Sequence, residues 1–146
     1  MKRLYLDMNI YNRPFDDQFQ VRIRLEAMAI NAILKMIKDG KFNLLWSFML
    51  EYENSLNPYE DIRMEIDMVS SLSSEYVGMA KDVLKDAKGF ESKGMRSRDA
   101  IHLACAIKGK ADYFLTCNDR LLKKAGIIKS DIAIMNPIDF VRLEVK

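Results

Sequence analysis

Apolar residues in the first part of the chain dominate two short segments, with a long helical periodicity between them. Residues 3–6 and 42–46 are apolar runs of strand length, as expected for strands that are buried on both faces. Residues 19–38 carry apolar side chains at helical spacing, and Gly40 follows as a helix-ending residue. The pattern therefore predicts a strand, a long amphipathic helix and a second strand, with a turn-rich loop over residues 8–18.

The middle of the chain has the pattern of three further helices. Ser47 is suited to cap the first of them, and the Asn57-Pro58 pair interrupts the chain after it. The apolar face of the third helix includes Tyr76 and Leu84. The predicted helices span residues 48–55, 59–70 and 74–87, and a loop is expected over residues 89–94.

The last third of the chain predicts helices that alternate with two short strands. Asp99 lies in the first turn of a helix with one buried apolar face, and Gly109 ends that helix. Asn118 and Asp119 are suited to cap the next helix, and Pro137 suits the first position of a terminal one. The predicted strands span residues 113–115 and 132–135, and the helix between them spans residues 120–125.

Strands that alternate with helices in this way predict an α/β fold. Such a chain forms a parallel sheet with right-handed crossovers and with helices on both faces. Its length of 146 residues suits one domain, and the sequence shows no linker, internal repeat or low-complexity segment. We therefore expect residues 1–146 to form a single domain.

Composition excludes several classes of protein. The formal net charge of +2 is too small for a protein that holds nucleic acid by bulk charge, although a local basic rim remains compatible with it. The two cysteines, Cys105 and Cys117, lack a CxxC or metal-ligand spacing, so buried free thiols are expected. No signal peptide is expected and no apolar run approaches the length of a membrane span, so the sequence predicts a cytoplasmic protein.

Two aspartates stand where an open parallel sheet gathers its ligands. Asp7 directly follows the first predicted strand, and ligands of such sheets bind beyond the carboxyl ends of the strands. Asp99 could serve only the dipole at its helix N-terminus, or it could join Asp7. Carboxylates that converge without basic partners are suited to a magnesium ion, which prefers oxygen ligands. Metal-assisted phosphodiester cleavage is the chemistry that this pattern favours.

Four segments together resemble the PIN domain, the fold of VapC-type ribonuclease toxins and of many RNA-processing nucleases. The segments are LYLDMNIYNRPF, SFMLEYENSLNP, RDAIHLACAI and ADYFLTCNDRLLKKA, which occur in the family's order and cover nearly the whole chain. The resemblance implies a three-layer α/β/α fold around a parallel sheet of four or five strands. It also implies an endoribonuclease that depends on Mg²⁺ or Mn²⁺ and cuts RNA with metal-activated water.

The resemblance also implies a set of metal-binding and catalytic residues. Spacing from Ser47 selects Glu53 rather than Glu51 as the second acid, although the choice between them stays open. Many PIN domains have Thr-x-Asp after the fourth strand, which would place an acid at position 118, where this chain has asparagine. The metal ligands and catalytic residues expected are Asp7, Glu53, Asp99 and Asp119, with Asn118 as an assisting ligand.

Residues around these acids are candidate contacts to the substrate. They are Asn9 and Arg13 after Asp7, Arg96 and Arg98 beside Asp99, and Thr116, which also orients the turn before Asn118. His102 lies three residues after Asp99 on the same helix, and a structural role is expected for it.

The resemblance further implies partners. A free-standing PIN domain of this size is similar to the toxin of a toxin–antitoxin pair, which would bind a small antitoxin protein and form a homodimer. The alternative is a PIN-fold module that binds RNA or a protein without cutting, which Asn118 keeps open. A metal-dependent phosphatase or a DNA nuclease could use the same pocket.

Overall fold

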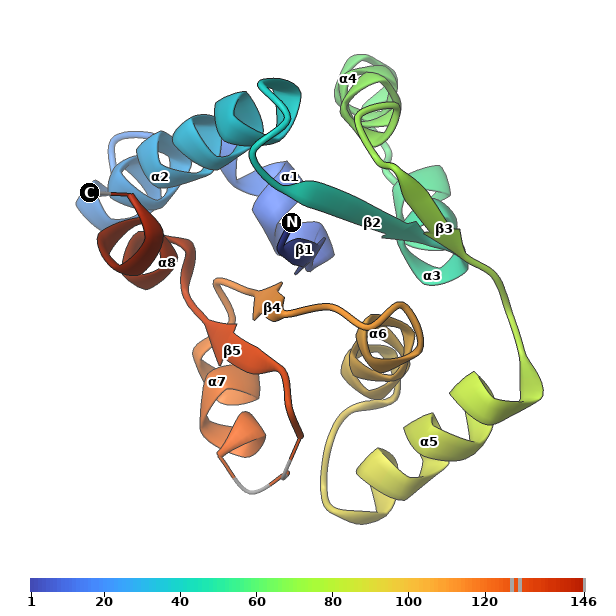
Figure 1. The fold of residues 1–146 in the computed structure, drawn as a ribbon. Coiled ribbons are helices and arrows are strands. Elements are labelled where there is room, and N and C mark those ends of the chain that lie inside the picture. The colour runs from blue at the N-terminus through green and yellow to red at the C-terminus, as the bar shows by residue number, and fades with distance from the viewer. Residues whose placement is uncertain (127, 129, 146) are drawn as a thin grey trace.

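Five parallel strands form the middle layer of the computed structural model, which describes residues 1–126, 128 and 130–145 (Figure 1). The strand order is β3-β2-β1-β4-β5. The strands are β1 (Arg3–Leu6), β2 (Asn43–Ser47), β3 (Glu75–Val77), β4 (Tyr113–Leu115) and β5 (Ala133–Met135). Along the chain, β2 and β3 are added on one side of β1, and β4 and β5 are then added on its other side. The reversal point of the strand order therefore lies between β1 and β4, where ligands bind in open α/β sheets.

Helices cover both faces of this sheet. In Figure 1, α2 and α8 pack together on one side, and α5 and α6 pack together on the other. The helices are α1 (Met8–Asn12), α2 (Val21–Lys38), α3 (Phe48–Ser55), α4 (Glu60–Ser70), α5 (Lys81–Ser92), α6 (Ser97–Lys108), α7 (Asp119–Ala125) and α8 (Pro137–Glu144), with a 3₁₀ turn, η1 (Arg13–Phe15). The predicted three-layer α/β/α fold is confirmed. Among the described helices, none combines the length and apolar character that a membrane crossing requires.

The central strands form the core because both of their faces are covered. Leu4, Tyr5 and Leu6 of β1 are fully buried, and the Tyr5 ring stacks on Phe114 of β4 with 5.3 Å between ring centroids. This burial on both faces is why the strands appear in the sequence as continuous apolar runs. The two cysteines are free and buried, as expected.

Helix caps predicted from the sequence are present. Ser47 Oγ accepts a hydrogen bond from the backbone N–H of Leu50 at 3.2 Å, so α3 begins directly where β2 ends. Asn136 Oδ1 accepts from the N–H of Ile138 at 2.8 Å, with Pro137 at the first position of α8. These caps bind backbone N–H groups that a helix start otherwise leaves without partners.

The helix predicted over residues 74–87 is confirmed for residues 81–87, which belong to α5, and is wrong for the residues before them. Residues Glu75–Val77 instead form the edge strand β3, which pairs with residues 45–47 of β2. Val77 is buried there, whereas Glu75 and Tyr76 are exposed, so the pairing with β2 and not the burial pattern identifies this segment as a strand. The following helix, α5, continues to Ser92 through much of the loop predicted over residues 89–94.

The loop predicted over residues 8–18 is also partly wrong, because it contains α1 and η1. The Asp7 carboxylate accepts a hydrogen bond from the N–H of Met8 and caps α1. A five-residue helix carries too little apolar periodicity to be recognised in the sequence.

A buried carboxylate connects α2 to two other parts of the chain. Glu26 on α2 is completely buried, and its Oε2 accepts a hydrogen bond from Asn136 Nδ2 at 2.6 Å. Arg13 Nε lies 3.4 Å from Oε1, and Arg22 Nε lies 3.4 Å from Oε2. Burying a charge is costly unless it is paired, so these partners are what make Glu26 tolerable in the interior.

We expect Glu26→Ala to lower the free energy of unfolding by about 3 kcal/mol, because the substitution leaves the partly buried Arg13 without its carboxylate partner. Urea denaturation measures this change. The matched control is Glu65→Ala at an exposed position of α4, which is expected to change stability by less than about 0.5 kcal/mol. Equal losses in the two variants would contradict the role given to Glu26.

Candidate active site

The carboxyl ends of β1, β2 and β4 bring three polar residues to one edge of the sheet. Asp7 follows β1, Thr116 follows β4, and Ser47 is the last residue of β2. The backbone N–H of Asp7 donates to the carbonyl of Leu115 at 2.9 Å, which continues the pairing of β1 with β4. The register of the parallel sheet therefore places Asp7 and Thr116 side by side.

Asp7 is buried and held in one orientation. Its Oδ1 accepts from the N–H of Met8 at 2.8 Å, and its Oδ2 accepts from Thr116 Oγ1 at 2.9 Å and from Asn9 Nδ2 at 3.1 Å. Asn9 also accepts from the N–H of Cys117 at 3.0 Å. Asn9 and Thr116, which we predicted as substrate contacts, thus both hydrogen-bond to the Asp7 carboxylate and position it.

His102 connects the sheet to α3. Its Nε2 is hydrogen-bonded to Glu53 Oε1, and its Nδ1 lies 2.7 Å from the Tyr5 hydroxyl, which lies 2.7 Å from Ser47 Oγ. His102 is 1% exposed, so the expected structural role agrees with its burial. Its Nε2 also lies 3.8 Å from Asp7 Oδ1, a proximity that the sequence analysis did not anticipate.

The structure distinguishes the two glutamates of α3. Glu53 faces His102, and its Oε2 lies 3.7 Å from the Arg98 guanidinium. Glu51 is exposed and accepts a hydrogen bond from the Tyr76 hydroxyl at 3.1 Å. Two residues apart on a helix point in different directions, and here Glu53 is the one that points to the site.

Asp7, Glu53 and Asp99 act on one another electrostatically, and we call these three residues the acidic cluster. Burial raises the pKa of Asp99, and the charge of Asp7 raises it further. Burial also raises the pKa of Asp7, with a further increase from Glu53, while His102 and the Thr116 hydrogen bond act in the opposite direction. Ionisation of Asp7 and Asp99 is therefore less favourable in the folded protein than in water, and repulsion among the three carboxylates is part of the cause.

His102 offsets part of this charge. Burial alone would lower its pKa, but the hydrogen bond to Glu53 and the charges of Asp7, Glu53 and Asp99 outweigh burial, so the pKa of His102 is raised. In the protonated imidazole both nitrogens donate, Nε2 to Glu53 and Nδ1 to the Tyr5 oxygen.

Asp119 lies apart from the acidic cluster, contrary to its predicted place as the fourth ligand. Its two carboxylate oxygens accept hydrogen bonds from the guanidinium of Arg22 on α2 at 2.7 and 2.8 Å. These bonds lower the pKa of Asp119, whose side chain is 60% exposed. Asn118 caps α7, because its Oδ1 accepts from the N–H of Arg120 at 3.0 Å and of Leu121 at 3.4 Å. Both side chains are thus committed to contacts outside the cluster.

Arg13 is likewise engaged elsewhere. Its guanidinium lies 3.3 Å from Asp16 and 3.4 Å from the buried Glu26. The substrate contact predicted for Arg13 is therefore replaced in this structure by ion pairs that support the fold.

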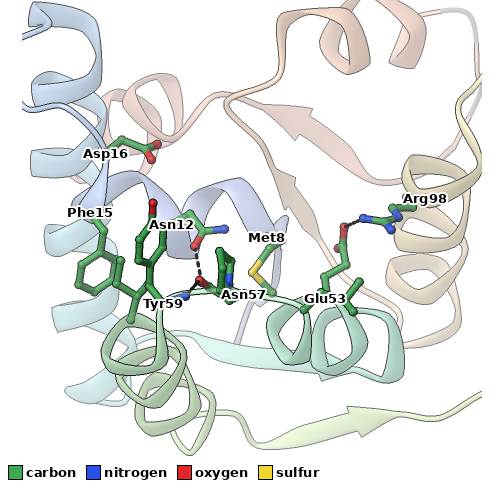
Figure 2. Close-up of a pocket in the computed structure, with 11 residues that line it drawn as sticks. Met8, Asn12, Phe15, Asp16, Glu53, Asn57, Tyr59 and Arg98 are labelled. Carbon is green, nitrogen blue, oxygen red and sulfur yellow. Dashed lines mark hydrogen bonds and ion pairs between the residues drawn. The ribbon is translucent and has the colours of Figure 1, made fainter.

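Two cavities flank the acidic cluster. A cavity of about 280 Å³ is lined by Asp99 with the basic residues Arg96, Arg120 and Lys124. A cavity of about 470 Å³ is lined by Glu53 and Arg98 at one end and by Phe15 and Tyr59 at the other (Figure 2). The predicted substrate contacts Arg96 and Arg98 thus line different cavities, Arg96 the smaller one and Arg98 the larger one.

The acidic cluster supplies the oxygen donors that Mg²⁺ and Mn²⁺ prefer. Burial raises the pKa of both Asp7 and Asp99, and repulsion from a neighbouring carboxylate raises each further, from Glu53 for Asp7 and from Asp7 for Asp99. A divalent cation would relieve this repulsion. In the described ranges, however, no three His, Cys, Asp or Glu side chains are gathered closely enough to enclose a metal ion. Glu53 would have to exchange His102 for the cation. The donor chemistry therefore fits a divalent ion, with His102 as the competing partner.

We expect Glu53→Gln to lower the pKa of His102 toward its ordinary value of 6.5, because the variant removes the charge and hydrogen bond that raise it. The imidazole NMR signal is unambiguous because the chain contains one histidine. In the wild type, the stability that this pair contributes is complete below pH 6.5 and declines as the pH rises through the folded-state pKa.

Glu51→Gln is the matched control, since Glu51 faces Tyr76, and it should leave the pKa of His102 unchanged. A His102 pKa that is the same in Glu53→Gln and in the wild type would contradict this assignment.

Comparison with known proteins identifies similar folds but no close relative in sequence. No family model matches the sequence, and no curated protein matches it either. Among solved structures, FitAcB from Neisseria gonorrhoeae matches with a TM-score of 0.61 and 16% sequence identity, over 92% of this chain and 97% of that one.

Two further structures match with a TM-score of 0.59 and 14% identity, over 92% of this chain and 98% of theirs. They are VapBC2 from Rickettsia felis bound to a DNA fragment from its promoter, and VapBC-1 from nontypeable Haemophilus influenzae. At these identities the likeness establishes the fold alone. The chain has the three-layer α/β/α architecture of the VapC-like PIN fold.

Proposed function

We propose that this chain is an endoribonuclease of the PIN/VapC type that depends on Mg²⁺ or Mn²⁺ and cuts RNA with metal-activated water. The observation that carries this proposal is the convergence of Asp7, Glu53 and Asp99 from three different elements at the reversal point of the sheet. A carboxylate cluster with incompletely neutralised charge has little structural value, whereas it is what a divalent cation requires. When bound, the ion supplies activation of water and stabilisation of charge on the phosphate.

Residues around the acidic cluster would orient its carboxylates and bind the RNA phosphates. Thr116, Asn9 and the N–H of Met8 fix the direction of the Asp7 carboxylate. Arg96, Arg120 and Lys124 form a basic wall beside Asp99, where RNA phosphates would bind.

His102 has two tasks in this arrangement. Its Nε2 holds the Glu53 carboxylate by a hydrogen bond, and in its protonated form its charge offsets part of the repulsion between the three carboxylates.

The proposed biological role is the toxin of a toxin–antitoxin pair that acts in the cytoplasm. The fold shared with the VapBC and FitAcB structures supports this role. The partner would be a small antitoxin protein whose arginine or lysine enters the acidic cluster, and the toxin would form a homodimer.

A PIN-fold module that binds RNA or a protein without cutting is the second candidate. It is favoured by two observations: Asp119 is bound to Arg22, and Glu53 is bound to His102. Both contacts remove a carboxylate from the set that a metal ion could use.

Cleavage of a mixed RNA substrate with Mg²⁺ or Mn²⁺ tests the enzyme directly. We expect Asp7→Asn and Asp99→Asn each to reduce the rate by about 100-fold or more, since even residues that only support metal ligands cost 10- to 100-fold. Asp119→Asn is the matched control and should retain most of the activity, because Asp119 lies outside the acidic cluster. Equal residual activity in all four proteins would indicate a contaminating nuclease and favour the non-cutting module.

Metal binding can be measured without cleavage. Addition of Mg²⁺ should lower the pKa of His102, because a cation at the acidic cluster replaces the negative charge that raises it. The NMR titration is repeated with Asp99→Asn, in which a higher Mg²⁺ concentration should be needed. A His102 pKa that does not respond to saturating Mg²⁺ or Mn²⁺ would contradict binding at this cluster.

A further inference from the structure

The larger of the two cavities begins at the acidic cluster and extends away from it. Met8, the residue after Asp7, and Glu53 line one part of its wall. Figure 2 shows Glu53 and Arg98 at one end, the rings of Phe15 and Tyr59 at the other, and Asn12 and Asn57 between them. Its volume of about 470 Å³ lies within the range of sites that take small ligands. A ligand in this cavity would therefore lie directly beside the carboxylates.

Two aromatic side chains at the far end of the cavity present their surfaces to solvent. Phe15 is 46% exposed and Tyr59 is 64% exposed, although both line the cavity. Within the described part of the chain, neither ring is paired with another aromatic ring. Aromatic faces of this kind are platforms on which the bases of single-stranded nucleic acids stack.

The middle of the cavity offers amide groups at the edge of such a base. Asn57 Nδ2 donates to Asn12 Oδ1 at 3.4 Å, which is a weak contact, and Asn57 Oδ1 accepts from the N–H of Tyr59 at 3.0 Å. Asn12 Nδ2 makes no hydrogen bond to another described residue. The Asn12 and Asn57 amides can therefore bond to the polar edge of a base.

The end of the cavity near the cluster carries a cation. Arg98 lies 3.7 Å from Glu53 and is placed over the Tyr52 ring at 6.0 Å. Arginine in this position can bind the phosphate that follows a base held against Tyr59. A base in the cavity would thus direct the adjoining phosphodiester toward Asp7 and Glu53.

We propose that this cavity is a base-binding subsite that accepts one unstacked base of single-stranded RNA on Phe15 and Tyr59. The inference rests on the proposed function, for which it specifies the substrate class. A base within a duplex is stacked and paired on its polar edge, so it cannot enter such a cavity. The subsite therefore selects loops and unpaired strands over continuous duplexes.

Binding without cleavage tests the subsite. The protein carries Asp99→Asn, and EDTA is present, so that a fluorescent mixed-sequence RNA strand is bound but not cut. Anisotropy should show that Tyr59→Ala and Phe15→Ala each weaken binding about tenfold, within the range for loss of one stacking platform. Tyr59→Phe should bind like the parent, since it keeps the ring, and Tyr76→Ala on β3 is the control for an exposed aromatic residue outside the cavity. The annealed duplex should bind more weakly than the single strand.

A base analogue reports on the cavity itself. The fluorescence of 2-aminopurine in the strand should be quenched on binding to the parent protein and less so with Tyr59→Ala. The proposal is overturned if the protein does not bind the single strand, or if the parent and both alanine variants bind it equally. The cavity would then be a site for a side chain of a protein partner.

The two proposals can fail separately. Tyr59-dependent binding by a protein that never cleaves RNA would support the subsite and reject the nuclease. If the protein cleaves RNA but its binding does not depend on Phe15 and Tyr59, the nuclease is supported and the subsite is rejected.

Discussion

The buried hydrogen bonds of His102 are the interaction on which the candidate site depends. The imidazole binds Glu53 through Nε2 and the Tyr5 hydroxyl through Nδ1, and Tyr5 in turn contacts Ser47. These contacts join β1, the end of β2, α3 and α6 at one point. Because Glu53, His102, Tyr5 and Ser47 are each hydrogen-bonded in this series, the sheet can carry polar and charged residues at an otherwise apolar position.

Three carboxylates near one another are unfavourable in a buried setting, and His102 explains how the fold tolerates them. Burial and mutual repulsion raise the pKa values of Asp7 and Asp99, while the charge of the imidazole acts in the opposite direction on both. The same imidazole occupies Glu53, so a divalent cation would compete with an internal one. The site is therefore an acidic cluster in which a protonated His102 offsets part of the negative charge, and a divalent cation would compete with it for Glu53.

Two arginines form ion pairs with carboxylates outside the acidic cluster. Arg22 takes both oxygens of Asp119, and Arg13 is held by Asp16 and the buried Glu26. The net charge is only +2, yet the charged and aromatic residues are unevenly distributed. Basic residues line the cavity beside Asp99, and aromatic residues line the cavity beside Glu53.

Local signals in the sequence determined most of the elements and the positions of two acids. Continuous apolar runs predicted β1 and β4, capping residues predicted the starts of α3 and α8, and strand ends placed Asp7 at the sheet edge. The two-residue spacing of Glu51 and Glu53 indicated that only one of them would face the site, and the resemblance to PIN domains favoured Glu53 without excluding Glu51.

Tertiary structure alone decided what depends on partners far along the chain. The edge strand β3 exists because it pairs with β2, and its three residues carry no local pattern of their own. Asp119 is withdrawn by Arg22, which is 97 residues away, and His102 meets Glu53 across 49 residues. Such contacts have no signature in local periodicity or capping, because the energy of a buried or paired charge depends on which groups the fold brings within a few ångströms.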